Sequence, residues 1–370
     1  MRIRRMMVAL AAAMVVAAPA EGKEYVVPAG QDVGQFFAAL PEDATCVVFS
    51  AAAEYRSNGD ILLPDRQMLI IDGRGCKLLL GTASNGFTRA VIDQKDADRR
   101  IANRYVFRDL GSVEGGRKGI DLKATLGSSI TDCRFKGQTE AAIDLRFCLM
   151  ARLQNVLVTA PGALGIVVRQ GDWPGASAVN SQSNSTVLEQ CRVFCSKTTT
   201  NAFTVLNSGG VRMSDCIAEG ATAQCDLFLS ATMDGDESRM ARNPVVKSFT
   251  LENFHVEHRT ERQSIYVNMP PKATVVLRNV YWNIPLTNPA VRYTMGQLNI
   301  SDIGWWNPDF RIATRVSAPR INVTRSHNAL NTGEKSGHTP QRAGSFVLEE
   351  ALPDNDRLSL SYIRITEVSM

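Results

Sequence analysis

Two aspartates occupy equivalent positions in neighbouring apolar segments, and each is followed by a basic residue. Asp121 precedes Lys123, Asp144 precedes Arg146, and the next segment of this kind ends at Arg169. If these segments are adjacent strands, the two carboxylates stack and repel, so they share a cation such as calcium or hold one raised pKa. The basic residues could neutralise a sugar carboxylate and assist proton abstraction in a β-elimination. The five residues are our candidate catalytic set, with Asp121 and Asp144 as candidate calcium ligands.

Four further residues are candidates for binding a substrate. Asp172 and Trp173 follow the last basic residue of the set directly, and an indole ring can stack on a sugar ring. His255 and Glu257 alternate along a later segment, so their side chains share one face and could form an acid–base pair.

Other interpretations of the same residues stay open. The acidic and basic residues would also form an exposed charge ladder that keeps a sheet soluble, worth only about 0 to 1 kcal/mol per pair. The segment with His255 and Glu257 would also suit an ordinary exposed strand. Two carboxylates about 5 Å apart would also serve a retaining glycosidase, so the pair alone does not select a reaction.

A recurring motif indicates the elements that position these residues. It has an apolar residue, a variable one, then Asn, Asp or Cys, then an apolar or aromatic residue. Its marked positions recur every twenty-odd residues, with two intervals longer by about half a period, which is typical of a solenoid with insertions. They are Asp109, Cys133, Asn155, Cys191, Cys216, Asn253, Asn279 and Asp302.

A second series of apolar segments keeps step with the first. Each begins 10 to 12 residues after a marked position, and the series starts at Ile120, Ile143, Ile166, Phe203, Leu227, Ile265 and Val291. Both series are short, alternate with a period of two and are rich in Val, Ile, Leu and Phe, as strands are. Two strand series in step predict that each repeat is one coil of a parallel β-helix.

The marked side chains are expected to face inward at a sharp turn. Asn stacked on Asn can satisfy backbone groups at the bend, and Cys fits the same slot as a small hydrophobe. Cys191 and Cys216 are consecutive marked residues, so a disulfide between them is geometrically conceivable, although we expect no dense disulfide framework. No CxxC spacing occurs among the eight cysteines, and the four histidines are scattered, so a zinc site is not expected.

In coil period and ladder the chain resembles the pectate lyase-like right-handed parallel β-helix superfamily, over about residues 24 to 310. The resemblance implies a right-handed helix, a saccharide substrate and catalytic groups on an exposed sheet. The chain lacks the Asn-Thr-Asp and Gly-His-Gly sets of polygalacturonases, the Gly-x-x-Asp-Phe of pectin esterases and the Arg-x-Pro-x-x-Arg of classical pectate lyases. No specific enzyme family is therefore matched.

The ends of the chain suggest export and capping. Residues 1–20 combine arginines, an apolar run and a small-x-small site, as a secretory signal peptide does, so we expect a secreted, periplasmic or cell-envelope protein. We expect the β-helix over 21–310, with an N-terminal cap at about 24–45 that includes a helix N-capped by Asp32, and a C-terminal cap or extension over 311–370. Beyond the signal, no segment is long and apolar enough to span a membrane.

The sequence predicts an all-β protein that acts on a polysaccharide. A net charge of +4 on 370 residues, with no basic run past the N-terminus, argues against a nucleic-acid partner. The first hypothesis is a lyase or glycosidase of an acidic glycan, with calcium as the possible cofactor. The alternatives are a non-catalytic glycan-binding protein and a structural adhesin or spike module. The sequence does not indicate the oligomeric state.

Overall fold

The computed structural model describes residues 23–220 without a break, followed by shorter stretches. These stretches cover 224–233, 247–257, 264–269, 273–282, 291–293, 297–301, 304–305, 309–314, 320–324, 327–328, 345–350 and 362–366. The predicted signal peptide therefore lies outside the described residues, and so do Asp302 and most of the insertion that the long interval between Cys216 and Asn253 predicts at about 231–244.

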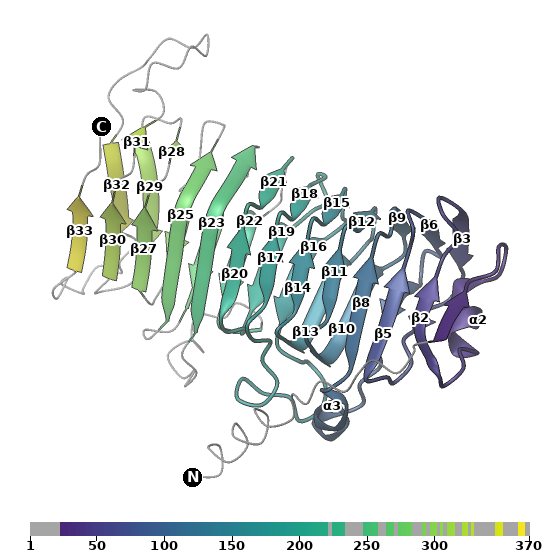
Figure 1. Cartoon of the computed structure of the whole chain (residues 1–370). Helices are drawn as coiled ribbons and strands as arrows, with labels where there is room; N and C mark the ends of the chain where they lie inside the picture. The colour runs from purple at the N-terminus through teal and green to yellow at the C-terminus, as the bar shows by residue number, and fades with distance from the viewer. Residues whose placement is uncertain are drawn as a thin grey trace, which may run out of the picture.

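Each regular coil contains three short strands, so the solenoid has three faces (Figure 1). The first face contains β1 (Lys23–Val26), β2 (Ala44–Val48), β5 (Met68–Asp72), β8 (Arg104–Arg108), β11 (Ser129–Thr131), β14 (Arg152–Gln154), β17 (Val187–Glu189), β20 (Val211–Ser214), β23 (Ser248–Glu257), β25 (Thr274–Trp282), β27 (Gln297–Ser301), β30 (Arg320–Thr324) and β33 (Tyr362–Thr366). All pairings between neighbours are parallel.

The second face follows the first after a bend. It contains β3 (Glu54–Ser57), β6 (Lys77–Leu80), β9 (Ser112–Gly115), β12 (Arg134–Lys136), β15 (Leu157–Thr159), β18 (Arg192–Phe194), β21 (Ile217–Glu219), β28 (Gly304–Trp305) and β31 (His327–Asn328). The long strands β23 and β25 run through the bend and join both faces into one sheet.

The third face is a separate sheet. It contains β4 (Ile61–Leu62), β7 (Asn85–Thr88), β10 (Lys118–Leu126), β13 (Ala141–Leu149), β16 (Leu164–Arg169), β19 (Asn201–Leu206), β22 (Cys225–Ser230), β24 (Ile265–Asn268), β26 (Val291–Tyr293), β29 (Asp309–Thr314) and β32 (Ser345–Glu350). This face corresponds to the second predicted series, and the chain is a right-handed parallel β-helix, as predicted. Past residue 310, β29, β30, β32 and β33 still pair with these faces, so the strand pairing does not stop at the expected boundary.

One residue in the left-handed conformation makes the bend between the first two faces. Asp109, Asp132 and Asn155 have φ of 51°, 54° and 51°, a region that Asn and Asp adopt more readily than most residues. Gln190, Asp215, Asn253 and Asn279 repeat this conformation. All of these side chains are exposed, so the expectation that Asn and Asp face inward at the bend is wrong.

The residue after each bend residue faces the interior instead. Cys133, Cys191 and Cys216 occupy this position and are fully buried as free thiols. They pack in one continuous core with the inward residues of the third face, such as Ile120 and Ile143. The motif therefore combined two adjacent columns, an outward polar one and an inward apolar one.

Two helices accompany the strands in the described part of the chain. Helix α2 (Val33–Ala38) is N-capped by Asp32, whose carboxylate accepts the Gln35 amide at 3.1 Å, and it lies at the N-terminal end of the solenoid (Figure 1). Helix α3 (Gln94–Arg100) was not expected from the sequence; it lies beside β10. Among the described residues, neither this nor any other helix is long and apolar enough to cross a membrane.

Candidate functional site

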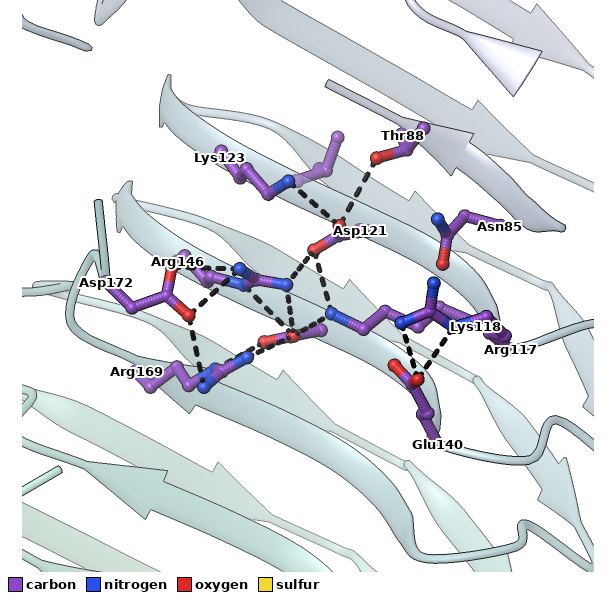
Figure 2. Close-up of polar contacts among 12 residues, drawn as sticks. Asn85, Thr88, Arg117, Lys118, Asp121, Lys123, Glu140, Arg146, Arg169 and Asp172 are labelled. Carbon is purple, nitrogen blue, oxygen red and sulfur yellow. Dashed lines mark hydrogen bonds and ion pairs between the residues drawn. The ribbon is translucent and has the colours of Figure 1, made fainter. Parts of the chain in front are cut away.

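The register of the third face brings the predicted catalytic residues together. Asp121 on β10 lies opposite Asp144 on β13, and Lys123 lies opposite Arg146. Arg146 in turn lies opposite Arg169 on β16. The stacked carboxylates and the basic row therefore exist, and we call these five residues with Lys118 and Asp172 the charge cluster (Figure 2).

Arg146 is the centre of the charge cluster. Its guanidinium donates to Asp121 Oδ1 at 2.9 Å, to Asp144 Oδ2 at 3.0 Å and to Asp172 Oδ1 at 2.9 Å (Figure 2). Such charge-assisted hydrogen bonds are among the strong ones in proteins. One side chain thus ties two coils to the insertion that follows β16.

The other cations complete the pairing of the two stacked aspartates. Lys118 Nζ lies 2.7 Å from Asp144 Oδ2, Arg169 Nη2 lies 2.7 Å from the same oxygen, and Lys123 Nζ lies 3.2 Å from Asp121 Oδ2. Lys118 was not among the candidates, although it lies only three positions before Asp121 in the sequence. Two carboxylates are therefore surrounded by four cations.

The charge cluster is not the exposed ladder that the alternation of strand residues predicted. Asp121 is 3% exposed and Asp144 is 1% exposed. Burial alone would raise the pKa of Asp144, but the hydrogen bond and charge of Arg169, with the charges of Arg146 and Lys118, outweigh burial and lower it. The expectation of a raised carboxyl pKa is therefore wrong for Asp144, which stays ionised and has no proton to donate.

The basic residues are equally unsuited to accepting a proton. Burial would lower the pKa of Arg146, but the charges of Asp144, Asp121 and Asp172 raise it above its ordinary value. For Arg169, burial is likewise outweighed by Asp144, and its pKa is raised. Both guanidiniums hold their protons firmly, so they can position or neutralise a group but cannot act as a general base.

The two aspartates do not suit calcium either. Both oxygens of each carboxylate already accept from a cation or a hydroxyl, Thr88 being the hydroxyl partner of Asp121. A calcium ion needs six to eight oxygen ligands, and the four cationic side chains that already surround these carboxylates would repel it. Among the described residues there is no group of three or more metal-binding side chains.

Trp173 anchors the insertion rather than facing a ligand. It is 8% exposed, packs against Phe147 with ring centroids 6.3 Å apart, and donates from Nε1 to Gln94 Oε1 at 3.0 Å. The backbone N–H of Gln94 donates back to the Pro174 carbonyl at 3.0 Å. Stacking of Trp173 on a sugar ring is therefore incompatible with this packing, while Asp172 stays partly exposed at the edge of the charge cluster.

His255 and Glu257 lie together as the alternation predicted, on the second half of β23. His255 Nε2 is 3.3 Å from Glu257 Oε2, and both side chains are partly exposed. This pair lies on the second face, away from the third face that carries the charge cluster. The sequence candidates thus fall on two different faces.

A groove at the bend was missed from the sequence. It has a volume of about 520 Å³ and crosses five coils. Its lining comprises Gly75, Lys77, Asp109, Gly111, Ser112, Asp132, Arg134, Asn155, Val156, Leu157 and Arg192, and we call it the bend groove. Its signal in the sequence was a basic residue two positions after a bend residue, as in Asp132 with Arg134 and Gln190 with Arg192.

The bend groove presents polar groups in a regular order. Asn155 Nδ2 donates to Asp132 Oδ1 at 2.6 Å, so bend residues of adjacent coils form a ladder on the outer surface. Arg134 and Arg192 are exposed, and among the described residues neither forms an ion pair with a carboxylate. Lys77 lies 3.6 Å from Glu54 and from Glu114.

Comparison with solved structures gives the fold but little sequence similarity. The chain is similar to the catalytic domain of a GH87 alpha-1,3-glucanase in complex with nigerose, with a TM-score of 0.55 and 12% identity over 96% of this chain and 70% of that one. A point variant of such a domain in complex with tetrasaccharides gives a TM-score of 0.50 at 12% identity, over 90% and 69%. The Streptococcus pneumoniae surface protein and adhesin PfbA gives 0.48 at 9% identity, over 90% and 94%.

No protein-family model matches the chain, and no curated protein sequence matches it significantly. Identities this low establish shared architecture and carry no activity with them. The chain is therefore a right-handed parallel β-helix whose site must be judged on its own residues.

Proposed function

We propose that this protein binds a polysaccharide along the bend groove, outside the cytoplasm. The observation that carries the proposal is the groove itself, which crosses five coils and so extends about 19 Å, since adjacent strands lie about 4.8 Å apart. Its lining repeats with the coils, and a polymer of repeating units can meet a repeating surface in register. A saccharide-bound β-helix among the structural neighbours is consistent with this proposal.

The lining has the chemistry that sugars need. Carboxylates such as Asp109 and Asp132 accept hydrogen bonds from sugar hydroxyls, and arginines donate to ring, hydroxyl and carboxylate oxygens. Leu157 adds an apolar contact between them. The predicted signal peptide supports a secreted or periplasmic location for such a protein.

The charge cluster does not carry the function in this proposal. Its two stacked carboxylates are buried and already paired, so the charge cluster serves to hold three coils and the insertion together. The predicted lyase or glycosidase activity consequently needs a different catalytic group.

Filling the groove tests the proposal. Ser112 lines the groove on β9, whereas Thr159 lies on β15 of the same face outside it, so Ser112→Trp and Thr159→Trp form a matched pair. Retention would be measured by affinity electrophoresis on a panel of neutral and acidic polysaccharides. We expect wild type and Thr159→Trp to be retained by at least one polysaccharide and Ser112→Trp to migrate freely. Equal migration of wild type in all gels and in the blank would refute glycan binding.

A second candidate function is cleavage of the bound glycan by the pair of His255 and Glu257. The observation that favours it is their separation of 3.3 Å, with His255 in the same outward column as Arg192. A rise in ultraviolet absorbance from unsaturated uronides would identify a lyase, and new reducing ends without that rise a hydrolase. Neither signal, or a signal that His255→Ala leaves intact, would exclude this pair as the catalytic group.

A further inference from the structure

One column of outward residues runs along the second face beside the bend groove. The strand register places its members one after another, one per coil. From β6 to β23 they are Lys77, Ser112, Arg134, Leu157, Arg192, Ile217 and His255, and Glu54 on β3 precedes Lys77.

The cations in this column alternate with uncharged residues. Lys77, Arg134 and Arg192 occupy every second coil. Since adjacent strands lie about 4.8 Å apart, neighbouring cations are about 10 Å apart along the solenoid axis. Lys77 is engaged with two glutamates, so Arg134 and Arg192 are the cations available to a ligand.

We infer that the bend groove selects an acidic polysaccharide that carries one anionic group on every second sugar. A pyranose ring with its glycosidic oxygen spans about one strand spacing, so a period of two coils corresponds to a disaccharide repeat. This inference rests on the proposed function and gives its substrate class: an alternating copolymer of an acidic and a neutral sugar.

The coils whose residue in this column is uncharged strengthen this selection. Ser112 and Leu157 would face the neutral sugar of each repeat. A polymer with a carboxylate on every sugar would place one at the coil of Ser112, where Asp109 lines the groove and the column holds no cation, whereas at the next coil Arg134 offsets the charge of Asp132. Like charges at such distances disfavour binding, and specificity often depends on a repulsive element of this kind.

The test compares polymers that differ in charge spacing. The probes are hyaluronan and unsulfated chondroitin, each with one carboxylate per two sugars, polygalacturonate with one per sugar, and neutral dextran. Dissociation constants would be measured at one fixed ionic strength, because salt screens exposed charges. We expect the two alternating polymers to bind most tightly, polygalacturonate more weakly and dextran most weakly.

Variants separate charge spacing from total charge. Arg134→Gln and Arg192→Gln should each weaken hyaluronan binding about tenfold, the loss expected for one charge-assisted hydrogen bond, and leave dextran unchanged. The double variant Arg134→Ser with Leu157→Arg keeps the formal charge but moves one cation by one coil. It should bind hyaluronan no better than Arg134→Gln. All of these side chains lie on the outer surface, and unchanged thermal midpoints would show that the variants fold.

Two results would overturn the inference while leaving glycan binding intact: polygalacturonate or dextran binding as tightly as hyaluronan, or undiminished hyaluronan binding by the shifted variant. If wild type bound none of the four polymers, the inference would fail, and retention of wild type on the wider electrophoresis panel would then decide whether the proposed function fails with it.

Discussion

Arg146 contacts a carboxylate from each of three segments, on β10, on its own strand β13 and on the insertion after β16. Removing one member of a buried ion-pair network leaves charges that neither water nor a partner compensates, and this is far more costly than the net value of the pairs. The same reasoning explains why these residues hold structure rather than perform acid–base chemistry.

Replacing Arg146 by Met should lower the free energy of unfolding by about 3 kcal/mol or more, because three carboxylates lose their common partner. Arg152→Met is the matched control: Arg152 pairs with Glu189 at 2.7 Å but is 57% exposed, so its loss should cost less than about 1 kcal/mol. Urea unfolding followed by circular dichroism would measure both. Similar losses in the two variants would contradict the buried-network interpretation.

Lys247 is a second unusual buried cation. It is 1% exposed, and within the described residues its ammonium donates to Gln182 Oε1 at 2.9 Å and to no carboxylate. Burial lowers the pKa of Lys247 to about 8 from its ordinary 10.5. The fold therefore favours the neutral amine, unlike the ion-paired arginines of the charge cluster.

The lowered pKa of Lys247 makes the stability of the folded protein depend on pH. The folded protein binds fewer protons than the unfolded chain between about pH 8 and 10.5, so the contribution of Lys247 to stability is full above 10.5 and is lost as pH falls through 8. The change amounts to at most about 3 kcal/mol. Lys247→Met should therefore be more stable than wild type at pH 7, with the difference shrinking by pH 10. A difference in unfolding free energy that did not vary over this range would contradict the assignment.

At the scale of elements, helix α3 and the insertion at 170–185 form one packed unit on the edge of the third face. Ala97, Ala124, Phe147 and Trp173 make a small apolar cluster separate from the main core. The insertion of this unit also places Asp172 against Arg146 (Figure 2).

Truncating the anchor should loosen the insertion without unfolding the coils. Trp173→Ala removes the ring contact with Phe147 and the hydrogen bond to Gln94, so limited proteolysis should cut within 170–185 at least tenfold faster. Val179→Ala on the same insertion, 67% exposed, should leave the rate unchanged. Mass spectrometry of the fragments would locate the cuts, and equal rates for the two variants would show that Trp173 is not the anchor.

The sequence predicted the strand columns and their register because both follow from period and alternation, which are local properties. It did not predict the burial of Asp121 and Asp144, because that depends on how the long cationic side chains of their own and neighbouring coils close over them. It also assigned Asp109 to the wrong side of the bend, since the direction of that side chain depends on the left-handed backbone conformation.

At the scale of the whole molecule, one core runs through the solenoid and contains several free thiols. Cys133, Cys148 and Cys191 come from different coils and are fully buried. Burial raises the pKa of Cys133 and of Cys148 to about 12, which further reduces thiolate formation. These thiols therefore report on the opening of the coils that contain them.

If the central coils unfold together, their thiols should become reactive at one urea concentration. Pulse labelling with a thiol reagent, resolved by peptide mass spectrometry, should give a common midpoint for these three cysteines, because they share one continuous core. Cys46, partly exposed on β2 near the N-terminal end, should react at lower urea. Separate midpoints for the three central thiols would instead indicate coil-by-coil unfolding, as nearest-neighbour coupling allows.

The left-handed bends also divide the solenoid into units of constant length. The same number of residues separates Asp109 from Asp132 and Asp132 from Asn155, and each of the three donates its amide to the next coil at 3.0 to 3.1 Å. Whole coils could thus be deleted or duplicated between bend residues without shifting any side chain to the other face. The distance between the cations of the bend groove is set by the number of coils between them. Such an edit would therefore lengthen or shorten that distance in steps of one strand spacing, and a series of variants would present cations at chosen spacings.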